Sequence, residues 1–522
     1  MRALLVTSVG VTCAAALSLP LAVPAASAPA RPPSVSPESP GTAPPSSARL
    51  AAEPAGEARP GTATGALAAT GADSATGSGA AAGPRNTFLR TGQPRAASEA
   101  AEPAGSTQSL PLEPLAASSD RVAGARAAQG LAQRDARPFS LVGVVWDDAE
   151  TELHGTVQVR TRATGSSDWS GWQDIETHNA EHAADLGSAE RESGSVRGAT
   201  APLWVGDSDG VEVRVRPEAH DHRSGDASAP LPEGMRLELV DPGEDPAPEP
   251  ARGAPAGRGA TQARFADTAP TVAAVPEALT AESAASSAVN AELAPLGATM
   301  IPALTKAETA QTANAAAGAK PYIGPRPGIV TRKGWGADEK LREKNFAYTK
   351  TVKAAFVHHS ATGNNYTCKQ APSVLRSIYR YHVQSSGWRD FGYNFAVDKC
   401  GNIYEGRAGG VTKAVLGAHT LGFNSNTMGI AVLGSFGSTN PPAAAVTAVS
   451  KLTAWKLGLF GANPKGKVTL VSGGSNKYKA GAKVKMNVIS GHRDGFVTEC
   501  PGARLYKKLG KARSSSASLQ GR

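Results

Sequence analysis

Two segments in the last third of the chain carry side chains that commonly bind metal ions. An apolar run that starts at residue 354 leads directly into His358 and His359, and a second segment holds His492 and Cys500. A catalytic zinc site takes three protein ligands from His, Cys or carboxylate side chains and leaves one position open for water. His358, His492 and Cys500 would supply such a set. Their spacing alone leaves a structural role open for each histidine.

The count of cysteines supports a metal-binding role for one of them. The four are Cys13, Cys368, Cys400 and Cys500, and Cys13 lies in a predicted export signal. Three then remain in an oxidising compartment, where cysteines usually pair in disulfides. If Cys500 binds a metal as a thiolate, Cys368 and Cys400 are left to form one disulfide.

The N-terminus has the pattern of a secretory signal peptide, residues 1–28. Arg2 supplies a positive charge, an apolar run extends over residues 3–21, and small residues allow cleavage after Ala25 or after Ala28. A membrane anchor is the alternative, but the run is short and no other stretch approaches 18 apolar residues. We therefore predict a secreted, extracellular protein with no transmembrane segment.

Composition divides the rest of the chain into folded and unfolded parts. Aromatic residues make up only 5% of the chain, and stretches rich in Ala, Pro, Gly and Ser cannot bury enough apolar surface to fold. A short ordered piece is expected near residues 109–112, and a transient helix around residues 278–296. The predicted regions are a disordered region at 29–136, a small all-β module at 137–243, a linker at 244–320, a folded domain at 321–513 and a tail at 514–522.

The prediction of an all-β module rests on short alternating runs. Apolar and polar residues alternate over residues 156–162 and 211–216, and turn residues separate these runs. Trp169 and Trp172 in this module are interpreted either as a carbohydrate-binding platform or, more often for such tryptophans, as strand-packing residues.

The C-terminal part is strongly basic. Residues 321–522 hold 30 Lys and Arg against 8 Asp and Glu, whereas the rest of the chain is acidic. Outside the cell, this charge favours anionic cell-wall polymers as a partner rather than nucleic acid. A contribution to solubility alone is the alternative explanation.

Several collinear motifs give the C-terminal region a recognisable pattern. Residues 321–513 resemble the peptidoglycan recognition protein family, the type 2 N-acetylmuramoyl-L-alanine amidases, in a bacterial secreted form. The β-rich module also resembles, more loosely, the N-terminal module of bacterial members. The motifs that carry the resemblance are Gly334-Trp335-Gly336, Val357-His358-His359-Ser360, Gly392-Tyr393-Asn394-Phe395, Gly417-Ala418-His419-Thr420, Gly491-His492-Arg493-Asp494 and Cys500-Pro501-Gly502.

The resemblance implies a fold and a catalytic site. The fold class would be α/β, a mixed central β-sheet flanked by helices with zinc in a surface groove, preceded by the all-β module and long disordered segments. The zinc ligands would be His358, His492 and Cys500. Tyr393 would be the catalytic tyrosine, and Thr498 would assist at the same centre. Consecutive side chains on an extended strand point to opposite faces, so His359 would not also be a ligand.

Three further residues are candidates for substrate binding, and the resemblance implies this role for His419. His359 would neighbour the metal, His419 would line the groove, and Arg407 would meet a carboxylate of the stem peptide. Arg407 is alternatively a surface arginine. The loop at 408–416 is longer than in the family, so the preference for the third residue of the stem peptide does not transfer.

The implied reaction is zinc-dependent hydrolysis of the amide between N-acetylmuramic acid and L-alanine in peptidoglycan. Zinc would polarise the carbonyl, and Tyr393 would hydrogen-bond the attacking water or the developing oxyanion. Glu405 is a distant candidate base and more simply a strand-end carboxylate. The alternative function is peptidoglycan recognition without cleavage, but non-catalytic family members typically lack the ligand that Cys500 provides. A monomer is expected.

Overall fold

A computed structural model describes residues 105–115, 128–177, 179–218, 230–246, 279–315 and 322–522. The predicted signal peptide, residues 1–28, and most of the predicted disordered region lie outside these ranges. No helix within the described ranges is long and apolar enough to cross a membrane.

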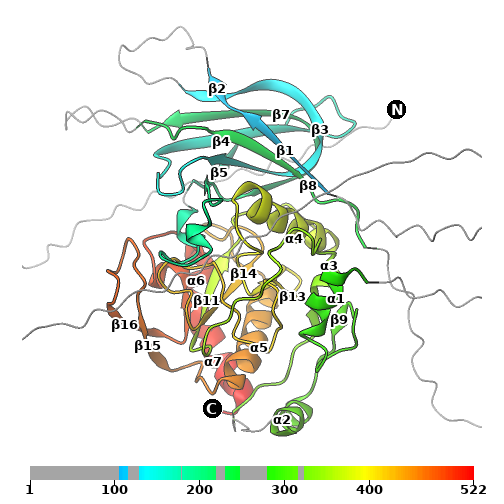
Figure 1. Cartoon of the computed structure of the whole chain (residues 1–522), viewed down its shortest axis with the longest axis vertical. Helices are drawn as coiled ribbons and strands as arrows, with labels where there is room; N and C mark the ends of the chain where they lie inside the picture. Colours follow the sequence, from blue (N-terminus) through cyan, green and yellow to red (C-terminus); the bar gives the residue numbers. More distant parts are fainter. Residues whose placement is uncertain (1–104, 116–127, 178, 219–229, 247–278, 316–321) are drawn as a thin grey trace, which may run out of the picture. The chain divides into compact units, whose positions relative to one another are not determined.

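The N-terminal part of the described chain is an antiparallel β-sheet with the order β1-β8-β3-β7-β4-β5, which agrees with the predicted all-β module (Figure 1). Apolar side chains that alternate along β3, β4 and β7 form its core, including Val142, Val157 and Val213. The strands are β1 (Ser106–Pro111), β2 (Glu113–Pro114), β3 (Gln129–Trp146), β4 (Gly155–Ala163), β5 (Gln173–Ile175), β6 (Gly198–Ala199), β7 (Leu203–Pro217) and β8 (Arg236–Asp241).

The module begins earlier than the sequence predicts. Strand β1 pairs with β8 along its whole length, so part of the predicted disordered region at 29–136 is a strand. Its only strongly apolar member is Leu110, Leu112 follows just after its end, and its backbone partner lies far along the chain. Long-range backbone pairing therefore orders a segment that composition alone assigns to disorder.

Trp172 packs against the guanidinium of Arg214, 3.9 Å from the ring centroid, as a strand-packing residue does.

The second part contains a mixed seven-stranded sheet with the order β17-β11-β14-β12-β13-β10-β9, as predicted for the α/β domain. Strands β17, β11, β14 and β12 run parallel to their neighbours, whereas β12 and β13 are antiparallel. A separate hairpin of β15 and β16 lies off this sheet. The strands are β9 (Met300–Ile301), β10 (Ile329–Val330), β11 (Ala354–His359), β12 (Phe395–Val397), β13 (Ile403–Glu405), β14 (Thr427–Val432), β15 (Lys467–Val471), β16 (Lys483–Asn487) and β17 (Ile489–Gly491).

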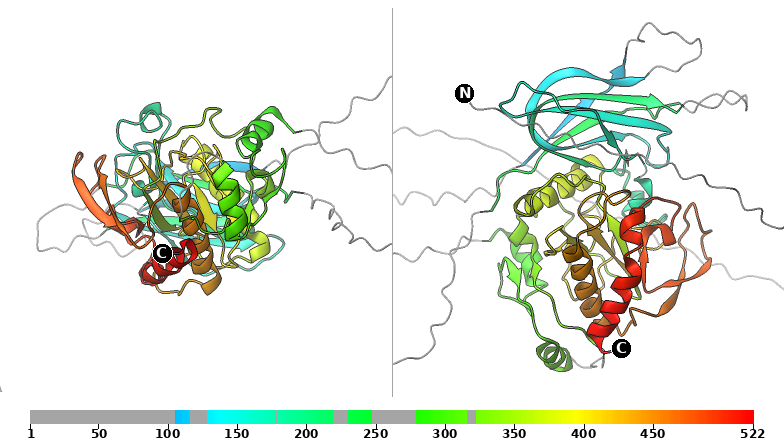
Figure 2. Two further views of the ribbon diagram at one scale, coloured as in Figure 1. Left: turned by 90° about the horizontal axis from the view of Figure 1, so that it is seen from below. Right: turned by 180° about the vertical axis from the view of Figure 1, so that it is seen from behind.

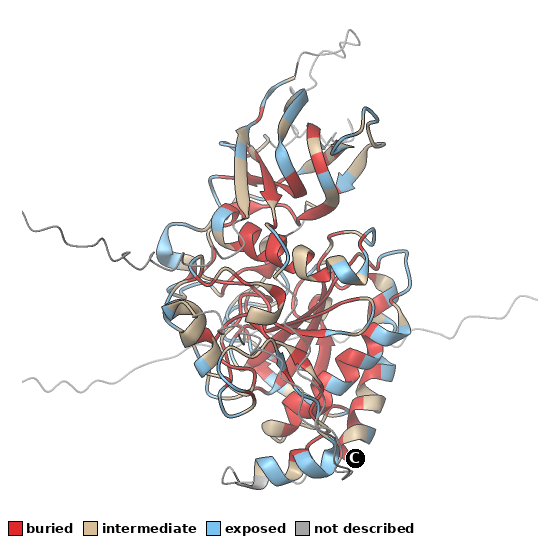
Figure 3. Ribbon diagram, turned by 90° about the vertical axis from the view of Figure 1, so that its right-hand side faces the viewer, coloured by how far each residue is buried: buried red, intermediate tan, exposed pale blue. Residues whose placement is uncertain are grey.

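Helices cover both faces of this sheet, and the strands between them are buried (Figure 3). Helices α5 and α7 lie side by side against one face, where Ile430 and Trp455 share a core with Leu509 (Figure 2). Helix α4 covers the other face. The helices are α1 (Ala281–Ala288), α2 (Lys306–Ala315), α3 (Arg332–Trp335), α4 (Ala371–Arg380), α5 (Ala443–Leu459), α6 (Ala503–Tyr506) and α7 (Leu509–Gln520), with short helical turns η1 (Ala180–His182), η2 (Arg191–Ser193), η3 (Cys368–Gln370), η4 (Tyr381–Ser385) and η5 (His492–Asp494).

Helix α4 also shares a hydrophobic core with the β-module. Its Ile378 belongs to one cluster with Leu141, Val145 and Trp204. Tyr381, directly after α4, donates a hydrogen bond to the carbonyl of Thr200 over 3.1 Å. The two parts therefore bury apolar and polar groups against each other, and the connection between β5 and β6 lies beside the α/β domain.

Two predicted boundaries of the α/β domain are wrong. The predicted linker at 244–320 contains α1, which lies within the helix expected around residues 278–296, and also α2 and β9, and Ile301 of β9 is fully buried in the core. The predicted tail at 514–522 is the end of α7, where the side chain of Gln520 donates to the carbonyl of Ala454 over 2.9 Å. Both segments are rich in Ala and Ser, so their composition resembles a linker, but their small side chains allow close packing on the larger core.

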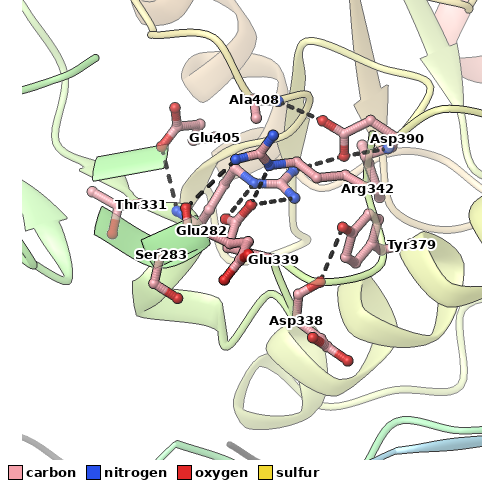
Figure 4. A network of polar contacts seen from close by, with 12 residues as sticks. Glu282, Ser283, Thr331, Asp338, Glu339, Arg342, Tyr379, Asp390, Glu405 and Ala408 are labelled. Atoms are coloured by element: carbon pink, nitrogen blue, oxygen red, sulfur yellow. Dashed lines mark hydrogen bonds and ion pairs between the residues drawn. The ribbon is translucent and has the colours of Figure 1, made fainter. Parts of the chain in front are cut away.

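A disulfide and an ionic network hold the loops of the domain. Cys368 and Cys400 form the disulfide, with 6.1 Å between their Cα atoms. In the network Glu339 binds Arg342 (Figure 4). Glu339 also binds Arg332, which in turn binds Asp390. All four side chains are less than 10% exposed, so each buried charge is compensated by a partner.

Candidate metal centre

Within the described ranges, one group of His, Cys and acidic side chains has ligand atoms close enough to hold a metal ion. It comprises His182, His358, His492 and Cys500, whose ligand atoms all lie within 4.8 Å of one another. His358, His492 and Cys500 are fully buried, and His182 is 4% exposed. The three residues predicted as ligands are thus brought together, and a fourth residue, which the sequence analysis did not select, joins them from the β-module.

The parallel strands explain why His358 and His492 meet. His358 lies near the carboxyl end of β11, and His492 follows directly after the carboxyl end of the adjacent strand β17. Parallel neighbours end at the same edge of a sheet, so residues far apart in sequence converge there. His359 is the next residue on β11 and is absent from the cluster, as strand alternation predicts.

Neighbouring side chains orient the cluster. Nδ1 of His358 lies 3.7 Å from Sγ of Cys500, and its Nε2 lies 3.4 Å from the hydroxyl oxygen of Thr420. Nδ1 of His492 lies 3.2 Å from Nε2 of His182. One nitrogen of His358 therefore faces the sulfur while the other has a polar partner, which is the usual arrangement of a metal-binding histidine.

Burial gives the cluster the electrostatics of a metal site. It lowers the pKa of His358 and of His492 well below the usual value, and it lowers the pKa of His182 to about 3. These imidazoles are therefore neutral and have lone pairs available at physiological pH. Burial also raises the pKa of the Cys500 thiol, so its thiolate form requires a compensating cation. Three neutral nitrogens and one sulfur in a buried cluster are a donor set that suits a transition-metal cation.

The two residues predicted to be catalytic lie beside the cluster. The ring of Tyr393 is 5.3 Å from the ring of His358, and burial raises the pKa of its hydroxyl, which therefore keeps its proton. Thr498 accepts a hydrogen bond from the backbone N–H of Cys500 over 3.0 Å and donates one to Glu181 over 2.8 Å. Both side chains are near enough to act on a group bound at the cluster.

Comparison with known proteins places the chain in a family. Residues 348–503 match the family model described as N-acetylmuramoyl-L-alanine amidase, and residues 94–273 match the model described as Rv3811 N-terminal galactose-binding domain-like. The chain is 32% identical to peptidoglycan-recognition protein SC2 of Drosophila simulans over 183 residues, which are 35% of this chain and 84% of that protein. The chain belongs to the peptidoglycan recognition protein and type 2 amidase family.

Two further relatives of this family are similar to the chain. The N-acetylmuramoyl-L-alanine amidase of Homo sapiens is 30% identical over 187 residues, which are 35% of this chain and 28% of that protein. Among solved structures, wild-type Drosophila PGRP-LB is 26% identical, with coverage of 35% of this chain and 91% of that chain and a TM-score of 0.27.

The three residues predicted to bind substrate in this peptidoglycan recognition domain are all covered. His359 lies 3.6 Å from the carboxylate of Glu176, and Arg407 forms an ion pair with Glu190. His419 is fully buried, and its ring lies 5.4 Å from that of His358. Arg407 is 7% exposed, so its alternative interpretation as a surface arginine is wrong. The expected surface groove is likewise not open, because residues of the β-module lie over these side chains.

Sequence reasoning missed His182 because nothing around it forms a metal-binding motif. It lies 310 residues before His492, in a segment of Ala, Gly and acidic residues. One available signal was the length of the connection that contains it. Between the alternating runs at 156–162 and 211–216 the chain is too long for a hairpin loop, and long loops in compact domains are commonly functional.

Glu405, the distant candidate base, makes its hydrogen bonds with residues outside the cluster. Its carboxylate accepts hydrogen bonds from the side chain of Asn290 over 2.8 Å and from the backbone N–H of Arg332 over 3.3 Å. Neither partner belongs to the cluster, and the interpretation of Glu405 as a strand-end carboxylate accounts for both contacts.

Proposed function

We propose that this protein is a secreted, zinc-dependent N-acetylmuramoyl-L-alanine amidase that cleaves peptidoglycan, with His358, His492 and Cys500 as its catalytic metal ligands. The observation that carries the proposal is the convergence of these three buried side chains, from β11, η5 and the loop after η5, beside Tyr393. The names of the relatives, a peptidoglycan-recognition protein and an amidase, support the same substrate.

The distances within the cluster support zinc as the metal. Bond lengths of about 2.0 Å to nitrogen and about 2.3 Å to sulfur at a tetrahedral ion separate two nitrogens by about 3.3 Å, and nitrogen from sulfur by about 3.5 Å. The corresponding distances are 3.2 Å between His492 and His182 and 3.7 Å between His358 and Cys500. Zinc bound at such a site acts as a Lewis acid toward an amide carbonyl and lowers the pKa of water.

The reaction adds water across the amide, which yields the lactyl carboxylate of muramic acid and the free amino group of L-alanine. Tyr393 keeps its proton and can donate it in a hydrogen bond to the oxyanion that develops on the carbonyl oxygen. Thr498, whose hydroxyl oxygen accepts a hydrogen bond from the backbone N–H of Cys500, would offer its hydroxyl to the same centre. The buried side chains around the cluster exclude bulk water, which strengthens these polar interactions.

The basic charge of the α/β domain supports association with the cell wall. Its excess of Lys and Arg would attract anionic wall polymers, and the reaction requires no nucleic acid partner. Together with the apolar N-terminal run, this favours an extracellular location for the monomeric enzyme.

The second candidate function is recognition of peptidoglycan without cleavage. The presence of Cys500 in the cluster favours catalysis, because binding alone requires no metal ligand there. Metal analysis of the purified full chain separates the two functions, with about one zinc per chain expected for the enzyme.

Product analysis completes the test. Defined muropeptides treated with the full chain and with variants of the β-module should yield stem peptides with a free N-terminal alanine, identified by mass spectrometry. A protein that carries no zinc and releases no stem peptide in any of these forms is not the proposed amidase.

A further inference from the structure

The connection between β5 and β6, residues 176–197, contacts the candidate metal centre and several of the polar residues around it. We call it the β5–β6 segment, and the structure describes it except for residue 178. It carries five acidic residues and two basic residues, whereas the domain that it contacts is strongly basic. Charge complementarity therefore favours its association with this surface.

His182 of this segment adds a fourth ligand atom to the candidate metal centre. Its Nε2 lies 3.2 Å from Nδ1 of His492, and its ring is 5.3 Å from that of His358. Four protein ligands are typical of a closed tetrahedral zinc site, whereas a catalytic site keeps one position for water. With His182 in place, the ligand set of the metal centre is complete.

Acidic side chains of the segment pair with the polar groups that surround the centre. Glu181 accepts a hydrogen bond from Thr498 over 2.8 Å, and the carboxylate of Glu176 lies 3.6 Å from His359. The backbone carbonyl of Glu181 also accepts a hydrogen bond from the N–H of Leu421 over 2.9 Å. The groups predicted to act on a substrate are therefore occupied by the chain itself.

Two further carboxylates anchor the segment farther along. Asp185 accepts hydrogen bonds from the backbone N–H of Gly422 over 2.8 Å and from the side chain of Asn424 over 2.7 Å. Glu190 binds Arg407 through two N–H groups, and both side chains are 6% exposed. Glu176 and Glu181 make their contacts before His182 in the chain, and Asp185 and Glu190 make theirs after it, so the segment is held over the centre on both sides of His182.

We propose that the β5–β6 segment is an internal inhibitor, which keeps the amidase closed by completing the metal ligand set with His182 and by occupying substrate-binding groups with its carboxylates. This inference rests on the proposed function. The active form of the enzyme is then the one in which the segment has left the site, and peptidoglycan must compete with it. Activity rises in proportion to the fraction of molecules in which the segment is released.

Ligand access to the metal tests the closure directly. The full chain is loaded with Co²⁺ in place of zinc, and its visible absorption spectrum is titrated with azide. The wild type should show no azide-dependent change, whereas His182→Ala should bind azide with a clear spectral shift. His154→Ala is the matched control, because His154 is an exposed histidine of the same module and should behave as the wild type.

A second variant acts away from the metal. Glu190→Gln removes the charge that pairs with Arg407 while leaving every cluster residue in place. It should raise the rate of stem-peptide release by about tenfold or more, since each 1.4 kcal/mol removed from the closed state changes its population tenfold. His182→Ala should raise this rate as well, and His154→Ala should leave it unchanged.

The outcomes separate this inference from the proposed function. If the wild type binds azide as His182→Ala does and all forms release stem peptides at the same rate, the amidase function stands and the internal inhibitor is excluded. If azide binds only to the opened variant while no form releases stem peptides, the segment closes the metal centre and the proposed amidase function is wrong. If the wild type does not bind azide, and His182→Ala and Glu190→Gln both release stem peptides faster than the wild type, the amidase function and the internal inhibitor are both established.

Discussion

Glu190 of the β5–β6 segment and Arg407 of the α/β domain form a buried ion pair with two hydrogen bonds, each 2.8 Å long. Arg407 also donates to the carbonyl of Phe391 over 2.8 Å, so its guanidinium is held rigidly. Burial opposes ionisation of Glu190, but the charge of Arg407 outweighs it and lowers the pKa of this carboxyl. The pair is therefore ionised at neutral pH and joins two parts of the chain that are far apart in sequence.

The first prediction concerns the contribution of this ion pair to the stability of the β5–β6 segment. Glu190→Gln should increase the hydrogen-exchange rates of backbone amides in residues 179–197 by at least about tenfold, because breaking a buried pair costs about 3–5 kcal/mol. Mass spectrometry of deuterated full-length protein measures these rates. Asp147→Asn is the control, since Asp147 pairs with Arg236 in the same module but is 64% exposed, and an exposed pair contributes about 0–1 kcal/mol. Equal effects of both substitutions would contradict a special role for Glu190.

The second prediction concerns metal binding. His358→Ala and Cys500→Ser should each lower the zinc content of the purified full chain at least about tenfold, because loss of a residue that only hydrogen-bonds to a metal ligand already costs about 10-fold to 100-fold in affinity. Inductively coupled plasma mass spectrometry after dialysis measures this content. His359→Ala provides a close control, because His359 is the next residue on β11 but is absent from the cluster. Loss of zinc from His359→Ala alone would reverse the assignment of the two histidines.

The third prediction concerns Tyr393. In the background of His182→Ala, Tyr393→Phe should lower kcat for stem-peptide release about 100-fold with little change in zinc content, since removal of one oxyanion donor typically has such an effect. Tyr366→Phe is the matched control. Tyr366 is buried in the same domain, but its hydroxyl donates to the carbonyl of Leu433 and not to the site. Equal kcat values for the two variants would exclude Tyr393 from the reaction.

The fourth prediction concerns pH and Glu405. Burial raises the pKa of this carboxyl from 4.5 to about 7, so the folded protein binds its proton more tightly than the unfolded chain does. Its contribution to stability is therefore fully present below about pH 4.5 and is lost as pH rises through about 7. Glu405→Gln should weaken the fall in stability over this range, as measured by urea unfolding of the full chain.

Two observations check this assignment. Glu292→Gln changes an exposed carboxylate that only accepts a hydrogen bond from Thr412, so it should keep the pH dependence of the wild type. Lys456 in the same core has its pKa lowered by burial to about 7. Its contribution to the pH dependence of stability therefore has the opposite sign: stability rises between about pH 7 and about 10.5. An unchanged slope between pH 4.5 and 7 in Glu405→Gln would show that the carboxyl is ionised in the folded state.

Local sequence patterns were sufficient for much of the fold. Alternating residues at 156–162 and 211–216 predict β4 and β7 because strand periodicity is a property of a few neighbouring residues. The apolar run that ends in His358 predicts β11 for the same reason. The short ordered piece expected near residues 109–112 overlaps β1, whereas β9 was missed, because its order depends on a distant backbone partner and not on its own composition.

The sequence by itself determined which side chains are chemically able to hold a metal, because His358, His492 and Cys500 occur in a recognisable motif pattern. Only the tertiary structure decided that these side chains converge, and that His182, Glu181 and Glu190 from another part of the chain lie over them. A contact between residues hundreds of positions apart has no local signature. It exists because packing of the β-module against α4 brings an acidic segment to a basic domain, and that packing is a property of the folded chain.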